Sequence, residues 1–207
     1  MAKLYFRYGA MNSGKSTILL QTAHNYEERG MHVILLKPGK DIKAENQVQS
    51  RLGVERKVDY LVDDDTSILD IVSGLENIAC VLVDEAQFLN TRQVDELLRV
   101  TTDYDIPVIC YGLRTDFMTH GFPGSIRLLE VAHSLEEMKT ICRCGSKATF
   151  NARFVNGELV TEGDQVAIDG FDNVTYESMC PKCYFKLKEG NKVLKLDNKN
   201  KGGKHGV

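Results

Sequence analysis

Runs of apolar residues alternate with amphipathic stretches over the first 130 residues of the chain. Continuous apolar runs of strand length are typical of strands that are buried on both faces of a sheet. The pattern predicts four such strands, at residues 3–8, 32–37, 78–85 and 106–113.

Amphipathic segments with helical spacing lie between these strands. Residues 16–29 predict a helix that Gly30 ends, and residues 91–102 predict another, with Asn90 or Thr91 as its N-cap. Apolar strands that are separated by helices indicate an α/β fold, with a mostly parallel sheet covered by helices on both faces.

The pattern changes near residue 139. Short strand-like patches follow, with the hairpin-forming pair Asn156-Gly157 and two pairs of cysteines, so we expect a small β-rich unit. No internal repeat is visible. The sequence thus predicts a main domain over residues 1–138, a β-rich unit over 139–191 and a polar, disordered tail over 192–207.

The composition fits this organisation. The chain has 207 residues, 43% of them hydrophobic and 27% charged, which suits one packed domain with a small appendage. The net charge is −3, but residues 192–207 hold five lysines and one acid, so the remainder carries −7. An acidic body disfavours a nucleic-acid partner, because general duplex binding needs a basic face. The lysine-rich tail is more typical of a solvated segment than of a nucleic-acid-binding arm.

Membrane and secretory segments are not evident. No run of about 18 apolar residues occurs, which argues against a membrane partner, and the first residues lack the apolar core of a signal peptide. We therefore expect a cytoplasmic protein, in which the six cysteines stay reduced and have a role other than disulfide formation.

The segment after the first predicted strand has the form G-x-x-x-x-G-K-S, which is typical of a loop that wraps a triphosphate. The glycines let backbone N–H groups face the phosphate oxygens, and the N-terminus of the next helix faces the same charge. Lys15 is expected to reach the β- and γ-phosphates and Ser16 to bind Mg²⁺. An ordinary glycine-rich turn is the alternative. The predicted ATP-binding residues here are Gly9, Ala10, Met11, Asn12, Ser13, Gly14, Lys15 and Ser16.

The third predicted strand ends in Asp84-Glu85, which completes a nucleotide-binding pair of motifs. Carboxylates at this end of a parallel strand lie where α/β sheets bind ligands. Asp84 is expected to hold Mg²⁺, directly or through water, and Glu85 to accept a proton from an attacking oxygen. A capping acid in a turn is the alternative. If the attacking oxygen belongs to water the protein is an ATPase, and if it belongs to a substrate hydroxyl the protein is a kinase; these motifs do not decide between the two.

The cysteines fall into two groups. Four occur as C-x-C and C-x-x-C pairs, which suit a tetrahedral structural Zn²⁺, although a C-x-C pair is less common than C-x-x-C; they are Cys142, Cys144, Cys180 and Cys183. Unligated thiols or a redox pair are the alternatives. Cys80 and Cys110 lie inside apolar strands and are expected to be buried in the core.

Several motifs together resemble the thymidine kinases of the small cytosolic, bacterial type, which carry a zinc-bearing lasso domain. They are GAMNSGKST, VDEAQF, YGLRTDF, FPGS, the four paired cysteines and Tyr176, and the resemblance covers roughly residues 3–190. It implies a P-loop NTPase (RecA-like) main domain and transfer of the γ-phosphate of ATP to the 5′-hydroxyl of thymidine or deoxyuridine, in nucleotide salvage for DNA synthesis. It also implies a homotetramer and feedback inhibition by thymidine triphosphate.

The same resemblance implies residue roles. Glu85 would be the base, Gln87 would join the ATP site, and Asp41 would help Ser16 and Asp84 with Mg²⁺. The thymidine site would consist of apolar walls and of backbone amides at residues 165–170: Met11, Phe88, Leu113, Phe117, Phe122 and Tyr176, with Gln165, Val166, Ala167, Ile168, Asp169 and Gly170. The chain departs from the family in a longer segment over residues 168–176, and in Asn151, where human-like members carry Thr.

Two other functions compete with this one. Asp84-Glu85-Ala86-Gln87 also resembles a helicase box, but a helicase needs a second ATPase domain for which the chain has no room. A zinc-ribbon interaction module would leave the phosphate loop without a use.

Overall fold

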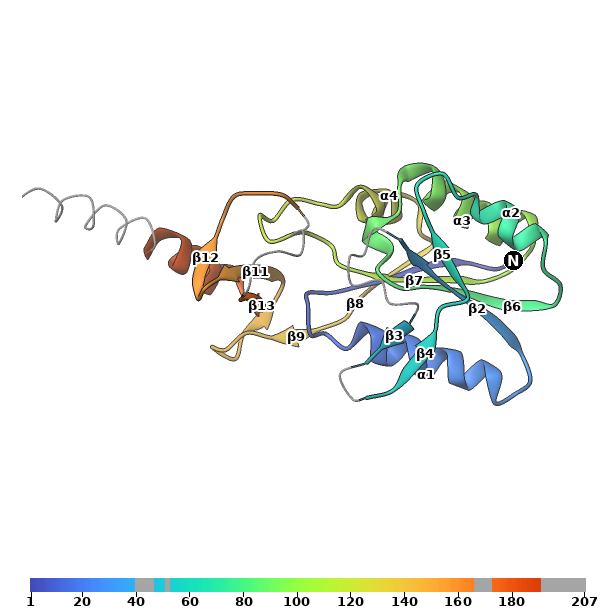
Figure 1. Ribbon diagram of the computed structural model, residues 1–207, viewed down its shortest axis with the longest axis horizontal. Helices are drawn as coiled ribbons and strands as arrows, with labels where there is room; N and C mark the ends of the chain where they lie inside the picture. Colours follow the sequence, from blue (N-terminus) through green and yellow to red (C-terminus); the bar gives the residue numbers. More distant parts are fainter. Residues whose placement is uncertain (40–46, 51–52, 166–172, 191–207) are drawn as a thin grey trace, which may run out of the picture.

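The computed structural model describes residues 1–39, 47–50, 53–165 and 173–190. A six-stranded sheet forms the larger part of the molecule (Figure 1), and every pairing within it is parallel. Its strands, in spatial order, are β5 (Tyr60–Val62), β2 (His32–Pro38), β6 (Ile78–Val83), β7 (Val108–Gly112), β1 (Leu4–Tyr8) and β8 (Ser134–Glu137).

Helices cover both faces of this sheet, as Figure 1 shows. α2 (Ile68–Ser73), α3 (Thr91–Asp103) and α4 (Pro123–Val131) pack on one face, and α1 (Lys15–Glu27) packs on the other. The apolar side chains between the sheet and α2, α3 and α4 form one buried cluster, and those between the sheet and α1 form a second. The two clusters are separate because alternate residues of each strand point to opposite faces. The predicted α/β class with a parallel sheet is therefore confirmed.

The sequence reasons for these helices are local. Asn90 caps α3: its side chain accepts from the Gln93 N–H, while the Gln93 side chain accepts from the Asn90 N–H. Val94, Leu97 and Val100 recur at helical spacing in α3 and are fully buried against the sheet. Of the two predicted N-caps, Asn90 is the one used.

Several predicted elements need correction. The strand expected to run to residue 85 ends at Val83, because Asp84 and Glu85 leave the sheet and a short 3₁₀ helix, η1 (Ala86–Phe88), follows. Further elements lack a strong sequence pattern because they are short or polar: α2, α4, β5, β8, and the antiparallel pair of β3 (Gln47–Gln49) and β4 (Glu55–Lys57).

Beyond residue 139 the chain forms small antiparallel sheets. β9 (Thr140–Ile141) pairs with β10 (Lys147–Ala148), and β11 (Phe150–Val155) lies between β12 (Glu158–Val160) and β13 (Val174–Met179). The predicted hairpin turn joins β11 to β12, with φ of 51° at Asn156 and 79° at Gly157. Residues 181–190 are helical, and the predicted tail over 192–207 lies outside the described residues. Within the described part of the chain, no helix combines the length and the apolarity that crossing a bilayer requires.

Candidate active site

The phosphate-loop sequence joins the end of β1 to the start of α1, as its motif requires. Asn12 and Gly14 have left-handed backbones, with φ of 62° and 80°, so the chain turns sharply before the helix. Lys15 is nearly buried, and its Nζ donates to the Ala10 carbonyl at 2.9 Å. The lysine amine is thereby held within the loop, at the N-terminus of α1.

Asp84 and Glu85 follow β6, beside this loop. Burial, reinforced by the neighbouring Glu85 charge, raises the pKa of Asp84 to about 7, and the amines of Lys37 and Lys15 act in the opposite direction. Glu85 has a left-handed backbone with φ of 48° and is half-buried. A buried acid between two amines is a suitable ligand for a divalent cation that arrives with a nucleotide.

A cavity of about 790 Å³ lies over the phosphate loop. That volume is within the range of about 300–1,000 Å³ that is typical of ligand sites. The loop, Glu85, and residues of β3 and β13 line it: Met11, Asn12, Gly14, Lys15, Ser16, Thr17, Ile18, Gln49, Glu85, Leu113, Val174, Thr175 and Tyr176.

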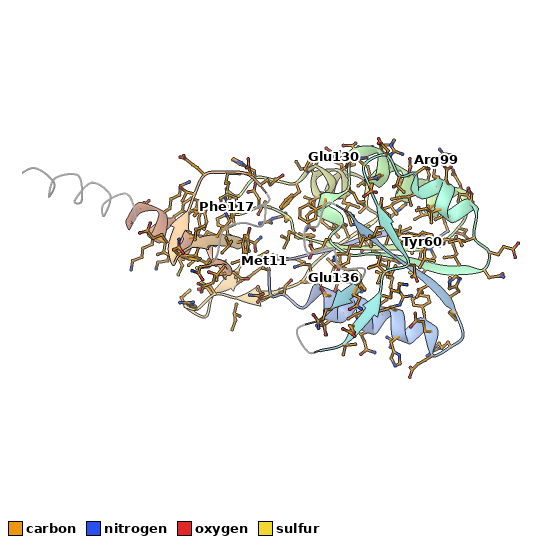
Figure 2. All side chains as sticks on the ribbon, in the orientation of Figure 1. Met11, Tyr60, Arg99, Phe117, Glu130 and Glu136 are labelled. Carbon is orange, nitrogen blue, oxygen red and sulfur yellow. The ribbon has the colours of Figure 1, made fainter. Side chains whose placement is uncertain are left out.

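An adjoining apolar cavity, of about 70 Å³, brings together every described residue that was predicted to contact the nucleoside. Phe88 and Phe122 meet edge to face in it, with ring centroids 5.6 Å apart. Figure 2 shows Met11 and Phe117 where the parallel sheet meets strands β9–β13. The lining residues are Met11, Phe88, Leu113, Asp116, Phe117, Phe122, Asn151, Gln165 and Tyr176.

Asp116 and Asn151 also line this cavity. Asp116 was not among the predicted site residues, and Asn151 was noted only as a departure from the family. Asp116 is buried; its Oδ1 accepts from the backbone N–H groups of Met118 and His120, both at 2.8 Å, and its Oδ2 accepts from Gln165 Nε2 at 3.1 Å. Its place in the YGLRTDF motif was the available signal.

Asn151, on β11, connects two distant loops. Its Oδ1 accepts from the Met11 N–H at 2.7 Å, and its Nδ2 donates to the Thr115 carbonyl at 3.0 Å. Ser178, on β13, donates from its hydroxyl to the Met11 carbonyl. The Met11 peptide is therefore held on both sides by the β-rich strands.

Gln87 lies in a different place from the predicted one. It was expected to contact ATP, but its side chain is buried, with 1% exposed, and lines neither cavity. Its amide instead contacts Glu85 and the backbone of Leu113. Asp41 and residues 166–170 lie outside the described residues.

The two cysteine pairs come together in space, with all four Sγ atoms within 4.8 Å of one another. Tetrahedral zinc with Zn–S bonds of about 2.3 Å would place the sulfurs about 3.8 Å apart, and the Sγ atoms of Cys144 and Cys180 are 3.6 Å apart. Hydrogen bonds from Ser146 and the neighbouring thiols lower the pKa of Cys144 to about 6, and hydrogen bonds among the same thiols raise the pKa of Cys183 to about 12; the support for a metal site is therefore the close approach of the four Sγ atoms. The donor set therefore fits a structural metal. Cys80 and Cys110 are fully buried in the core, as predicted.

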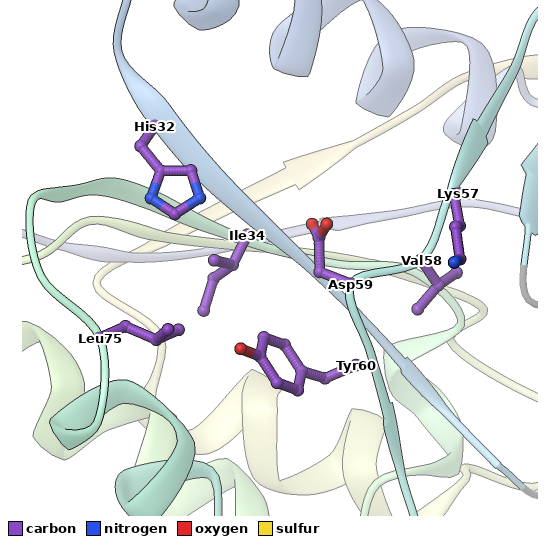
Figure 3. Close-up of a pocket in the computed structure, with 7 residues that line it drawn as sticks. All are labelled: His32, Ile34, Lys57, Val58, Asp59, Tyr60 and Leu75. Carbon is purple, nitrogen blue, oxygen red and sulfur yellow. The ribbon is translucent and has the colours of Figure 1, made fainter.

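Another hollow, of about 270 Å³, lies at the opposite end of the parallel strands, where β2 begins (Figure 3). Asp59 is its acidic group, and the carboxylate accepts from the Leu35 N–H at 2.7 Å and from Arg56 at 3.0 Å. These bonds hold the chain against β2 just before β5. Asp59 therefore has a structural role.

The family model and the curated relatives indicate the same family. The family model described as thymidine kinase matches residues 2–184. Similar curated proteins include thymidine kinases of Ruegeria pomeroyi, 48% identical over 88% of this chain and 93% of the relative, and of Legionella pneumophila, 44% identical over 97% and 98%. The thymidine kinase of Idiomarina loihiensis is 48% identical over 88% and 95%. Among solved structures, a Pif1 helicase complex on forked DNA matches 66% of this chain and 39% of its own with a TM-score of 0.35 and 14% identity, too weak a likeness to bear on function.

Proposed function

The chain belongs to the thymidine kinase family, and we propose which of its residues carry out the family's reaction, transfer of the γ-phosphate of ATP to the 5′-hydroxyl of thymidine to give dTMP and ADP. One observation supports the assignment above the others. The cavity over the phosphate loop and the apolar cavity share Met11, Leu113 and Tyr176, and Glu85 lines the first of them. A nucleotide and a nucleoside bound side by side would therefore meet next to this carboxylate.

The phosphate loop, residues 9–16, would bind ATP. Backbone N–H groups of the loop and the N-terminus of α1 face its phosphates, and Lys15 neutralises the charge that develops on transfer. Ser16 and Asp84 would hold Mg²⁺, which would offset the negative charge of the phosphates, with Asp41 as an expected additional ligand. Asp84 must lose its proton to do so.

Glu85 would orient the 5′-hydroxyl and accept its proton as the oxygen attacks the γ-phosphate. Phosphoryl transfer needs little covalent participation from the protein, so positioning the acceptor is the main contribution of such a base.

Thymine would occupy the apolar cavity, between Phe88 and Phe117 and against Tyr176. A flat base suits aromatic walls with a few fixed polar groups, and residues 165–170 would supply backbone groups to its edges. A deoxyuridine base would fit the same walls.

Zinc on the four cysteines would be structural. It would fix the turn at residues 142–145 against residues 180–183 and thereby support β11 and β13, which reach the Met11 peptide. On this basis we divide the chain into a nucleotide-binding domain over 1–138, a zinc-binding lasso domain over 139–191 and a tail over 192–207.

Family membership also supports proposals about the protein in its cell. We expect a cytoplasmic homotetramer that takes part in nucleotide salvage for DNA synthesis, is inhibited by thymidine triphosphate, and has neither a nucleic-acid nor a membrane partner.

The test is an assay with ATP, Mg²⁺ and thymidine that follows dTMP directly. The wild-type protein should form dTMP, and Glu85→Gln should lower kcat about 10²- to 10⁴-fold, the usual contribution of a general base, while ATP still binds. Glu76→Gln, at an exposed position before β6, should keep wild-type turnover. ADP release that depends on DNA or RNA without dTMP formation would overturn the proposal, and unchanged turnover in Glu85→Gln would remove Glu85 as the base.

A further inference from the structure

A chain of hydrogen bonds leads from the wall of the apolar cavity to Glu85. From it we propose that Gln87 is a positioning residue for phosphoryl transfer, whose side-chain amide holds the Glu85 carboxylate toward the acceptor hydroxyl. The proposal rests on the proposed role of Glu85 and replaces the expected ATP contact of Gln87.

The contact with Glu85 is short. Gln87 Nε2 donates to Glu85 Oε2 at 2.6 Å, from a residue two positions further along the chain. Glu85 is half-buried and lies between the end of β6 and η1, outside both elements. A carboxylate in such a turn has several rotamers available, so a fixed donor on one oxygen restricts where the other oxygen points.

The orientation of the Gln87 amide is determined by its other end. Gln87 Oε1 accepts from the backbone N–H of Leu113 at 3.0 Å. A backbone N–H can only donate, so the amide oxygen must face Leu113 and the amide NH₂ must face Glu85. The side chain therefore presents a donor, not an acceptor, to the carboxylate.

The Leu113 peptide is itself held in place. Ser125, fully buried on α4, donates from its hydroxyl to the Leu113 carbonyl at 2.5 Å. The residue before Leu113 is Gly112, where an added Cβ would lie 2.7 Å from Gln87 Oε1. The end of β7 is thus shaped to admit the Gln87 side chain.

This arrangement links the wall of the nucleoside cavity to the proposed base. Leu113 lines both cavities, and Glu85 lines the one over the phosphate loop. Through Gln87, the backbone that forms part of the nucleoside wall also sets the direction of the base. The hydrogen bond engages one oxygen of the Glu85 carboxylate and leaves the other oxygen to accept from the 5′-hydroxyl.

Steady-state kinetics of Gln87→Met test the proposal, because methionine keeps the length of the side chain and removes both hydrogen bonds. We expect kcat to fall about 10- to 100-fold, with the KM values for ATP and thymidine within threefold of wild type. Gln93→Met is the matched control: Gln93 is also buried and hydrogen-bonded, but in the N-cap of α3. It should lower the melting temperature and leave kcat unchanged.

Gln87→Glu is a second variant, which keeps the shape and the acceptor for Leu113 but places a second carboxyl group against Glu85, so that the two groups share a proton and Glu85 is a poorer base. It should also lower kcat without a matching rise in KM. A folded Gln87→Met or Gln87→Glu protein with wild-type kcat would overturn the proposal, as would a raised KM for ATP with unchanged kcat, which would make Gln87 an ATP contact.

A double-mutant cycle separates this proposal from the role of Glu85. If Gln87 acts through Glu85, Gln87→Met should cause no further loss of kcat in the Glu85→Gln background. Additive losses would contradict the positioning role. If Glu85→Gln alone retains full turnover, the role of Glu85 fails first; if it does not, and Gln87→Met does, only the present proposal fails.

Discussion

The parallel sheet and the strands beyond residue 139 achieve order by different means. The sheet is packed on both faces by helices, with fully buried side chains such as Leu36, Leu82 and Leu97. The smaller part buries a few side chains, among them Ala152 and Tyr184, next to its cysteines. A unit with so little apolar core needs another source of stability, and a metal on the four cysteines would supply it. The proposed catalytic carboxylates, Asp84 and Glu85, lie in the first part, and part of the proposed nucleoside wall lies in the second.

Several hydrogen bonds join the two parts, and two of them hold the backbone of Met11. Met11 belongs to the phosphate loop, yet its N–H is bound by Asn151 and its carbonyl by Ser178. Thr140 adds a hydrogen bond from its hydroxyl to the Asn12 carbonyl at 3.3 Å. The strands beyond residue 139 thereby hold the loop over residues 9–16, which we propose to bind phosphate.

Removing the metal ligands should have the largest effect, and it should destabilise the strands beyond residue 139 without unfolding the parallel sheet. Structural zinc contributes about 10–16 kcal/mol in small zinc domains, so Cys180→Ser/Cys183→Ser should lose its zinc and most of its turnover. Hydrogen exchange should show loss of protection in β11 and β13 while β1, β6 and β7 remain protected.

Metal analysis provides the control. The wild-type protein should hold about one zinc per chain, and Cys80→Ala/Cys110→Ala, which also removes two cysteines but from the core, should keep it. A fully active wild-type protein without zinc would contradict the difference between the two parts.

Breaking the connection at Met11 should have a smaller effect. Asn151→Ala leaves the Met11 N–H and the Thr115 carbonyl without these partners, and a buried unsatisfied group costs about 1–3 kcal/mol. We expect kcat/KM to fall about 10- to 100-fold for both ATP and thymidine, measured by dTMP formation. The exposed Asn25→Ala on α1 should have no effect. A loss confined to thymidine would show that Asn151 serves the nucleoside cavity and not the phosphate loop.

The smallest expected effect concerns the sheet alone and depends on pH. Burial raises the pKa of Asp84 to about 7, so between pH 6 and 7 the folded protein holds a proton that the unfolded chain has released. Without nucleotide and metal, its free energy of unfolding should therefore fall with rising pH, by about 1 kcal/mol over this interval.

Urea unfolding at the two pH values measures this change. Asp84→Asn should remove it, and Asp70→Asn, at an exposed position on α2, should leave it in place. An equal pH dependence in wild type and Asp84→Asn would show that Asp84 is already ionised in the folded protein.

Elements with a strong local signal could be predicted from the sequence. The buried strands β2 and β7 are continuous apolar runs. In α3, both the N-cap and the helical spacing of apolar residues are visible in the local sequence. β8 has an exposed Leu135 between polar residues at the edge of the sheet, so its pattern is that of a loop. α2 is only six residues long, although Ser67 caps it through the Asp70 N–H.

The candidate site likewise contains residues that local motifs predict and contacts that they do not. Contiguous motifs predicted the phosphate loop, Asp84 and Glu85, and the cysteine spacing predicted the cluster that the structure assembles. The contact from Asn151 to Met11 spans 140 positions, and that from Gln87 to Leu113 spans 26. Such pairings depend on how β6, β7 and β11 are arranged in space, which local patterns do not contain.

The left-handed backbone at Glu85 has a consequence for directed evolution of this protein. A residue with a Cβ in that conformation costs about 1–2 kcal/mol relative to the right-handed form, whereas Gly adopts it without strain and Asn tolerates it. A library selected for heat resistance alone should therefore enrich Gly or Asn at position 85 and lose turnover. Glu85 therefore lowers the stability of the fold while serving as the proposed base. Selection for both heat resistance and turnover is needed to retain glutamate at this position.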